Sequence, residues 1–292
     1  MRAVFNVFSG TGNTDKVCRA IMAEWTDAGV ECKYVHIGKD CEVRDPNKFD
    51  RMVIGYPVHA FNAPQPVFEF IKKLPQCSGG VLVYLVKTSG EPLGLNDGSC
   101  AHMYDLLRKK GYKVCGEYHY VMPYNMIFRH SDGMAARMWQ AALRRIPSES
   151  REMLEGRVKK LKKGPLNRLV SFIFRIEHPA MHMIGKSFKV TDACTGCGKC
   201  ARGCPQKNIT MANGKPVFGG HCVGCVKCSF GCPEDAIKIG VLNGWRVNGS
   251  YDFSGVPATD DEVCRYCRRS YIKYFREAEK YPLPGEGGKA AE

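Results

Sequence analysis

Half of the sixteen cysteines in this 292-residue chain lie within one stretch of 39 residues. They form two runs with the same spacing, C-x-x-C-x-x-C-x-x-x-C-P, made of Cys194, Cys197, Cys200 and Cys204, then Cys222, Cys225, Cys228 and Cys232. Three cysteines at two-residue intervals on a tight turn can supply three thiolates to a cubane iron–sulfur cluster, and the fourth thiolate must come from elsewhere. The spacing therefore predicts two [4Fe–4S] clusters.

A pair of zinc sites, each held by four cysteines, is the alternative interpretation. Zinc sites favour two C-x-x-C pairs separated by a long loop, and zinc chemistry does not call for three cysteines at two-residue intervals followed by C-P, twice. Residues 192–211 also repeat as residues 220–239 with an offset of 28, which indicates a duplicated half-module. Glycines within the repeat are expected to let backbone N–H groups point at the sulfurs.

Residues 187–240 resemble the bacterial two-[4Fe–4S] ferredoxins, with all eight ligand positions matched. In that family the fourth cysteine of each run ligates the other cluster. The resemblance implies that cluster I is held by Cys194, Cys197, Cys200 and Cys232, and cluster II by Cys222, Cys225, Cys228 and Cys204. It also implies a small α+β domain whose two halves are tied together by the exchanged ligands.

The remaining cysteines are scattered along the chain. Cys264 and Cys267 form a further C-x-x-C, but two thiols alone hold neither a cluster nor a closed zinc site. We interpret them as a buried pair or an incidental spacing, with a redox dithiol or a half-site completed by a partner as the alternatives. Six single cysteines are expected to be small buried hydrophobic residues; they are Cys18, Cys32, Cys41, Cys77, Cys100 and Cys115.

A phosphate-binding loop is the second chemical feature. Ser9, Gly10, Thr11, Gly12, Asn13 and Thr14 follow a strand-like run and open a helix. Free N–H groups at a helix N-terminus favour a phosphate, and the hydroxyl side chains can complete the cradle. Neither the G-K-[ST] ending of a nucleotide triphosphatase loop nor the dinucleotide pattern G-x-G-x-x-G is present. A neutral, hydroxyl-rich loop suits a single phosphate monoester.

This loop resembles the FMN-phosphate loop of the flavodoxins, and the resemblance extends over residues 1–150. In that fold the cofactor lies outside the carboxyl ends of the strands, so residues 56–64 and 88–94 are expected to hold the flavin ring. The expected ring contacts are Tyr56, Pro57, His59, Phe61, Asn62, Thr88, Ser89, Gly90, Glu91 and Gly94. Tyr124 and Asn125, after the last strand, are a third expected contact.

Alternating apolar and helix-like segments must position both features. Strands are expected at 3–8, 31–37, 51–55, 80–87 and 113–121, and helices at 13–28, 65–74 and 99–110. Strands that recur with helices between them imply a doubly wound, flavodoxin-like α/β fold with a five-stranded parallel sheet. Gly164-Pro165 interrupts the helical pattern that begins at Gly133, so the last helix of this domain is expected to end near Lys163.

Four segments are expected: a flavodoxin-like FMN domain at 1–163, a basic amphipathic linker at 164–186, a two-[4Fe–4S] ferredoxin domain at 187–240 and an extension at 241–292 that packs on the body. Residues 151–190 carry ten Lys or Arg and three acids. Within the linker, one helical face is expected to dock on the protein, with a membrane surface or a partner as the alternatives. That face comprises Leu166, Leu169, Val170, Ile173, Phe174 and Ile176.

The amino-acid composition and net charge exclude several classes of protein. With 44% apolar residues the chain is not disordered as a whole, and no apolar run reaches the roughly 20 residues of a membrane span. The N-terminus shows no signal-peptide pattern, so a cytoplasmic protein is expected. The net charge of +14 is interpreted as compensation for anionic cofactors and as a means of docking, and nucleic-acid binding through residues 159–163 is the weaker alternative.

Joined flavodoxin-like and two-cluster ferredoxin segments resemble the flavodoxin–ferredoxin fusion proteins of anaerobes. The resemblance implies an electron carrier that passes electrons between FMN and the clusters and links ferredoxin-type and flavin-type redox proteins with acidic docking surfaces. A homodimer is a further possibility. The alternative is an FMN-dependent reductase acting on a small organic substrate, a quinone or NAD(P)H, although no acid, base or nucleophile constellation stands out near the ring segments.

Overall fold

The computed structural model describes residues 1–161, 164–260 and 268–284 of the chain. Five parallel strands form its central sheet in the order β2-β1-β3-β4-β5, which is the flavodoxin-like doubly wound order. The strands are β1 (Arg2–Val7), β2 (Glu31–His36), β3 (Arg51–Pro57), β4 (Leu82–Ser89) and β5 (Lys113–Val121). The predicted fold class is thereby confirmed for the larger part of the chain.

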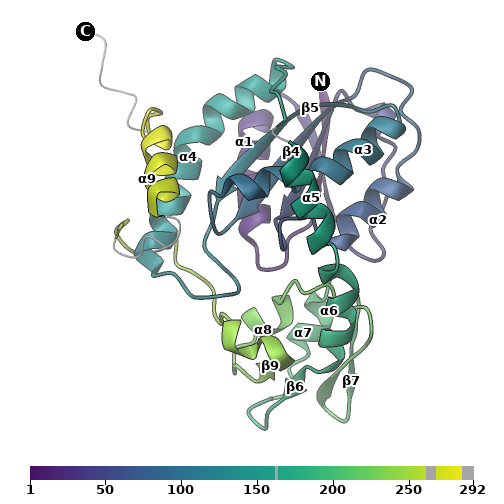
Figure 1. Cartoon of the computed structure of the whole chain (residues 1–292), viewed down its shortest axis with the longest axis vertical. Coiled ribbons are helices and arrows are strands. Elements are labelled where there is room, and N and C mark those ends of the chain that lie inside the picture. The colour runs from purple at the N-terminus through teal and green to yellow at the C-terminus, as the bar shows by residue number, and fades with distance from the viewer. Residues whose placement is uncertain (162–163, 261–267, 285–292) are drawn as a thin grey trace.

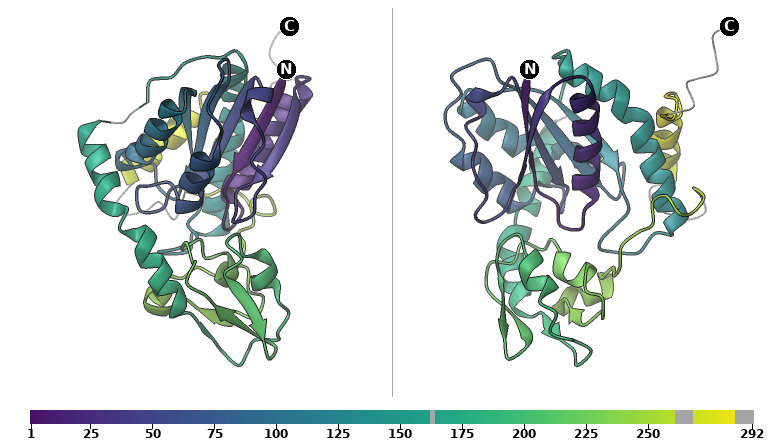
Figure 2. Two further views of the ribbon diagram at one scale, coloured as in Figure 1. Left: turned by 90° about the vertical axis from the view of Figure 1, so that its right-hand side faces the viewer. Right: turned by 180° about the vertical axis from the view of Figure 1, so that it is seen from behind.

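Helices cover both faces of this sheet (Figures 1 and 2). One face packs on α1 (Asn13–Asp27) and α4 (Asp132–Leu154), and the other on α2 (Gln65–Lys73) and α3 (Ala101–Lys109). Both strand faces are apolar because each is buried, as in β1, where Val4 packs on the α2–α3 side and Phe5 on the α1–α4 side. Short 3₁₀ turns lie at Pro46–Lys48, Gly94–Gly98 and Gly240–Trp245.

The last helix of the α/β part ends earlier than the sequence predicted. Helix α4 stops at Leu154 rather than near Lys163, because Gly156 adopts a left-handed backbone conformation with φ 78° and turns the chain. The Lys159 N–H then donates a 2.8 Å hydrogen bond to the carbonyl of Cys115 in β5. The chain therefore runs back beside the sheet before the next helix.

Two helices, α5 (Pro165–Phe174) and α6 (Glu177–Lys186), lead from the sheet to the cysteine-rich region (Figure 1). That region contains the two-stranded antiparallel sheets β6 (Lys189–Val190) with β9 (Ile237–Lys238), and β7 (Ile209–Ala212) with β8 (Lys215–Phe218). The short helices α7 (Lys199–Gly203) and α8 (Lys227–Phe230) begin at equivalent positions of the two repeats.

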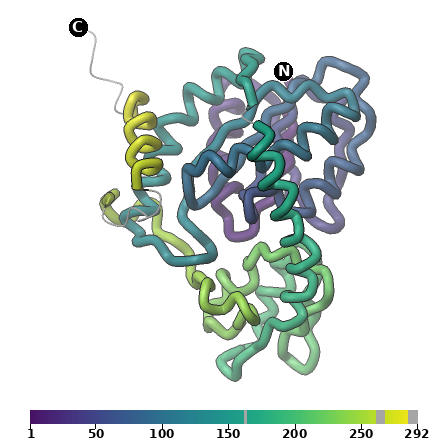
Figure 3. Tube along the Cα trace, in the orientation of Figure 1, coloured from purple at the N-terminus to yellow at the C-terminus, as the bar shows by residue number. Residues whose placement is uncertain are grey.

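After the cysteine-rich region the chain returns to the sheet, where α9 (Arg268–Ala278) packs on α4 (Figure 3). Tyr271, Phe275 and Ala278 of α9 are buried in one cluster with Met134, Met138 and Ala141 of α4. The part of the extension that the structure describes thus packs on the body of the protein. None of the helices described is both long enough and apolar enough to cross a membrane.

Candidate functional site

A cleft opens at the carboxyl ends of β1, β3, β4 and β5, at the point where the strand order reverses. Loops after parallel strands meet at the same edge of a sheet, so segments distant in sequence converge there. The cleft is lined by Ser9, Gly10, Thr11, Asn13, Thr14, Pro57, Val58, His59, Thr88, Ser89, Gly90, Met122, Pro123, Tyr124 and Asn125.

The loop at residues 9–14 is fixed by hydrogen bonds to the other walls of the cleft. The Thr14 hydroxyl, which is buried, lies 2.7 Å from the Thr88 hydroxyl, and the Asn125 amide donates to Thr11 Oγ1 at 3.0 Å. Asn13 Nδ2 donates to the carbonyl of Pro123 at 2.8 Å. Within the loop, Ser9 Oγ accepts the N–H groups of Gly12 and Asp15 at 3.2 and 3.3 Å. Hydroxyls and N–H groups therefore gather at the start of α1, as a phosphate requires.

Five of the expected ring contacts do not line this cleft. Tyr56 is fully buried below the sheet edge, and its hydroxyl donates to Glu117 Oε1 at 2.6 Å. Asn62 is also fully buried, and its amide donates to the carbonyl of Ser171 in α5 at 2.7 Å. Phe61 packs edge-on against Phe174 of α5, with ring centroids 5.0 Å apart.

The remaining two residues lie on the segment after β4. Glu91 places its carbonyl against the Ser89 hydroxyl at 2.6 Å, and Gly94 lines a separate hollow beside β5. Gly12 faces the cysteine-rich region instead of the cleft. Val58, Met122 and Pro123 line the cleft although no chemical motif in the sequence marks them; only their position after β3 and β5 could have indicated them.

Two histidines near the ring side of the cleft, the half-buried His59 and the buried His130, are neutral at neutral pH. Burial, and then His178, lowers the pKa of His59 to about 4, and burial lowers the pKa of His130 to about 4. Burial also raises the pKa of the Glu177 carboxyl, 3.8 Å from His59 Nδ1, to about 7. Between about pH 4 and pH 7 the His59–Glu177 contact is therefore one between two neutral groups.

The C-terminal extension fixes the same edge of the sheet from outside. The Tyr271 hydroxyl donates to the carbonyl of Gly90, and the Tyr251 hydroxyl donates to the carbonyl of Tyr124 at 2.6 Å. The Tyr124 ring stacks on His130 with a centroid distance of 5.4 Å, and a β-carbon at Gly90 would lie 2.4 Å from that tyrosine ring. Loops 88–91 and 122–125 are thus held in place by residues far along the chain.

Four cysteines from both runs line one small cavity in the cysteine-rich region. These are Cys194, Cys197, Cys200 and Cys232, the set expected for cluster I. The fourth member comes from the second run, because α7 and α8 lie side by side and bring the two repeats together.

Cys204 of the first run lies among the cysteines of the second. Burial raises the pKa of Cys225 to about 12, and the neighbouring thiolates of Cys222 and Cys204 raise it as well. Burial, and then Cys225, Cys222 and Cys204, also raise the pKa of Cys228. Cys200, in contrast, interacts with Cys197 and Cys194 of its own run. These neighbours match the set expected for cluster II.

The two repeats have the same local geometry around the fourth cysteines. Cys204 Sγ accepts the N–H of Asn208 at 3.4 Å, and Cys232 Sγ accepts the N–H of Ala236 at 3.4 Å, 28 residues later. Gly196 and Gly224 both adopt a left-handed conformation, with φ 70° and 66°. N–H groups directed at the sulfurs stabilise thiolates, which is the form that binds a metal cluster.

Within residues 1–161, 164–260 and 268–284, no group of three or more His, Cys, Asp or Glu side chains is placed to hold a metal ion as the chain stands. The donor set, four sulfurs in each group with N–H groups aimed at them, fits an iron–sulfur cluster.

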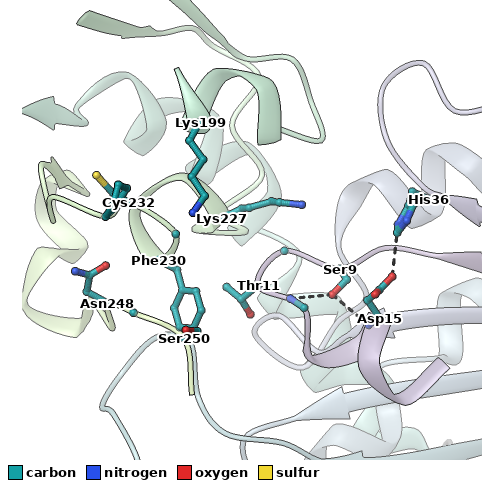
Figure 4. A pocket seen from close by; sticks show the side chains of 15 residues that line it. Ser9, Thr11, Asp15, His36, Lys199, Lys227, Phe230, Cys232, Asn248 and Ser250 are labelled. Atoms are coloured by element: carbon teal, nitrogen blue, oxygen red, sulfur yellow. Dashed lines mark hydrogen bonds and ion pairs between the residues drawn. The ribbon is translucent and has the colours of Figure 1, made fainter. Parts of the chain in front are cut away.

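The cleft and the cysteine-rich region are in contact. A β-carbon on Gly10 of the phosphate loop would lie 2.5 Å from the carbonyl oxygen of Cys225, and the Lys39 N–H donates to the Pro205 carbonyl at 2.9 Å. Beside this contact is a cavity of about 540 Å³ (Figure 4). Lys199 and Lys227, which are equivalent in the two repeats, line it opposite Thr11.

Other cysteines occupy the positions that small apolar residues take. Cys18, Cys100 and Cys115 are buried, and Cys32, Cys41 and Cys77 are half-buried. Burial raises the pKa of Cys18 and, to a smaller extent, of Cys115. Cys264 and Cys267 lie outside the described residues.

Fold and cleft define a flavodoxin-like α/β protein joined to a small cysteine-rich region with short sheets. No family model matches the chain, and no curated protein matches it. Solved structures that are similar to it include two flavodoxins and a flavoprotein. A short-chain flavodoxin associated with a PDU bacterial microcompartment has 16% identity and a TM-score of 0.42, over 53% of this chain and 97% of its own.

The flavodoxin of Streptococcus pneumonia TIGR4 has 15% identity and a TM-score of 0.39, over 53% of this chain and 99% of its own. A flavoprotein from Lactobacillus acidophilus, solved in complex with FMN, has 19% identity and a TM-score of 0.33, over 40% of this chain and 92% of its own. These matches cover about half of the chain or less.

Proposed function

We propose that this protein transfers electrons between FMN, bound in the cleft at the sheet edge, and two [4Fe–4S] clusters, bound by the two cysteine sets. One observation carries the proposal: Gly10 of the phosphate loop packs directly on the backbone of Cys225 of the second set. Two groups of residues suited to different redox cofactors therefore share a contact within one chain.

The loop and its surroundings supply what the FMN phosphate needs. Thr11 and Ser9 offer hydroxyls, and the first turn of α1 offers N–H groups and the positive end of its dipole. His59 and Tyr124 supply flat faces on the ring side, and Gly90 supplies a carbonyl-bearing turn without a side chain. His59 and His130 are neutral at neutral pH, so they add no positive charge to the ring side of the cleft.

The two cysteine sets supply the cluster ligands. Cluster I takes Cys194, Cys197, Cys200 and Cys232, and cluster II takes Cys222, Cys225, Cys228 and Cys204. Cluster II is the nearer to the cleft, because Val223 and Cys225 pack on the core of the α/β part. When bound, each cluster exchanges one electron at a time and FMN one or two, so the protein would connect one-electron to two-electron partners.

The net positive charge of the chain indicates which redox proteins it would bind. A net charge of +14 is expected to attract redox proteins with acidic docking surfaces, and the exposed lysines near the cluster I cysteines, Lys199 and Lys215, suit such docking. The reductase alternative requires room for an organic substrate at the ring. Helices α5 and α6 close over residues 59–63 on that side, which favours the carrier.

An anaerobic preparation tests the proposal directly. We expect about one FMN, about eight irons and about eight sulfides per chain, and no stoichiometric zinc. In stopped flow, a one-electron donor should bleach the cluster absorbance first and the flavin absorbance within a second. Iron-free protein serves as the control, since its flavin should be reduced by the same donor far more slowly.

The reductase alternative has its own signature. Rapid turnover of a quinone or NAD(P)H by protein that lacks clusters would favour it. A preparation with stoichiometric zinc, or with flavin reduction that is equally fast without clusters, would contradict the electron-transfer proposal.

A further inference from the structure

Helices α5 and α6, with the turn between them, expose six large apolar side chains, here named the apolar ridge. Its members and their exposed fractions are Leu166 66%, Leu169 54%, Phe172 64%, Ile173 57%, Ile176 72% and Met183 76%. The sequence predicted that the helical face containing Leu166, Leu169, Ile173 and Ile176 would dock on the body of the protein, and that prediction is wrong for these four residues. Phe174, a further member of the predicted face, does contact the body at Phe61. The two helices run along the outside of the molecule, as the left view of Figure 2 shows.

The opposite face of the helices is the one that packs inward. Ser171, the only buried residue of α5, donates its hydroxyl to Asn62 Oδ1 at 2.6 Å and accepts the Asn62 amide at its carbonyl. In α6, His178 Nε2 lies 3.2 Å from the carbonyl of Ala63, and Gly185 abuts Cys222. These contacts fix the rotation of both helices, so the apolar ridge cannot turn inward.

Positive charge surrounds the apolar ridge. Between Gly156 and Ile176 the sequence has seven Lys or Arg and no Asp or Glu. The Arg175 guanidinium lies over the Phe172 ring at 5.1 Å, and Lys72 and Lys109 lie on the neighbouring helices, where they and Arg175 lower the pKa of His102 after burial does. The acidic neighbours are Asp105, which pairs with Arg168, and Glu177, the first residue of α6, which faces His59.

We propose that the apolar ridge inserts into the surface of a membrane that contains anionic lipid. A helix with Leu, Ile and Phe on one face and Lys and Arg beside them lies in the plane of the headgroup region, with its apolar face about 5–10 Å deep. Soluble monomers rarely expose a contiguous apolar patch of this kind without a partner for it. A second copy of the chain would bring the same positive charge to the contact, whereas phosphate headgroups neutralise it.

Binding is peripheral, since neither helix is long enough to span a bilayer. The apolar ridge contains no expected FMN or cluster ligand. A failure of this proposal therefore leaves the electron-transfer proposal standing, and the reverse also holds.

Vesicle flotation with the full-length protein tests the proposal. We expect it to float with phosphatidylcholine vesicles that contain anionic phosphatidylglycerol, and to bind at least tenfold more weakly to pure phosphatidylcholine or in high salt. The double variant Ile173→Gln/Ile176→Gln should lose at least tenfold in binding to the anionic vesicles. The matched control, Val217→Gln/Ile272→Gln, changes two exposed apolar residues outside the apolar ridge and should bind as the native protein does.

Three results would overturn the proposal. One is native protein that stays unbound with both kinds of vesicle. Another is a control double variant that loses binding as strongly as the ridge variant. The third is a native dimer in gel filtration that Ile173→Gln/Ile176→Gln converts to a monomer, because a second copy would then cover the apolar ridge. Unchanged far-UV circular dichroism of both variants excludes misfolding as the cause.

Discussion

A β-carbon at Gly10 would lie 2.5 Å from the carbonyl oxygen of Cys225 and 3.1 Å from the β-carbon of Cys225. Both distances are shorter than ordinary contacts between these atoms, and the nearer atom belongs to the backbone. Glycine at position 10 thus sets how closely the loop after β1 approaches the second cysteine run. This contact is the point at which the two expected cofactor sites meet.

Gly10→Ala should therefore push the two parts of the chain apart. We expect a loss of about 1–3 kcal/mol in stability from overpacking, together with slower flavin reduction by the clusters. Thermal unfolding and stopped flow measure the two effects. Gly244→Ala is the matched control, since a β-carbon there meets no atom within 4 Å. Equal behaviour of the two variants would show that the contact at Gly10 is unimportant.

Serine substitutions test the exchanged ligands. Cys204→Ser and Cys225→Ser should each remove the same cluster and leave about four irons, and the double variant should also retain about four. Combining Cys204→Ser with Cys197→Ser should remove both clusters. Iron and sulfide analysis of anaerobically purified protein distinguishes these outcomes. Retention of about four irons by Cys204→Ser/Cys197→Ser would mean that each run serves its own cluster.

Glu177→Gln should alter the pH dependence of stability. The pKa of Glu177 is raised by burial from its usual 4.5 to about 7, so the folded chain holds more protons than the unfolded chain between these values. Stability from this group is present below pH 4.5 and is lost as the pH rises to 7. The variant should therefore gain about 2–3 kcal/mol relative to the native protein between pH 5 and pH 8.

His59 acts in the opposite direction. Its pKa is lowered to about 4, so its contribution to stability is lost as the pH falls from 6.5 to 4, and this loss remains in the variant. Chemical denaturation at several pH values measures both effects. Glu69→Gln, at an exposed carboxylate, should track the native curve; a Glu177→Gln curve parallel to the native one would mean that the carboxyl is already ionised.

Tyr271→Phe removes the hydroxyl that donates to the carbonyl of Gly90. One lost hydrogen bond of this kind costs about 1 kcal/mol, which corresponds to about a fivefold weaker affinity if it loosens the flavin loop only. Titration of the apoprotein with FMN measures this change. Tyr281→Phe is the control, because its hydroxyl makes no hydrogen bond to the residues that the structure describes. Equal FMN affinities would show that the loop after β4 does not depend on α9.

The sheet could be predicted from the sequence because its information is local. Continuous apolar runs such as residues 81–86 and the helices between them specify a parallel sheet, and the phosphate loop follows directly from its place between β1 and α1. Expected and observed strand ends differ by no more than two residues.

Ring contacts were harder to predict because they depend on which way each side chain turns. The Tyr56 side chain points into the core and donates a hydrogen bond to Glu117, 61 residues away along the chain. The Asn62 amide donates to the carbonyl of Ser171, 109 residues away. The exposed face of α5 was mispredicted for the same reason, because the sequence does not show which way a side chain turns. Helical spacing shows that a face is apolar but not which face the protein buries, and here the small polar residue Ser171 packs inward.

The helix pair α5 and α6 contacts residues next to both expected cofactor sites. The inner face of α5 and α6 holds Asn62 beside the cleft at one end and rests Gly185 on Cys222 at the other. A cofactor that orders one end of this helix pair also reduces the conformational freedom of the other end. Binding at the other end then costs less conformational entropy. If both cofactors bind as proposed, cluster assembly and flavin uptake are expected to be thermodynamically linked, each raising the affinity for the other by the same factor.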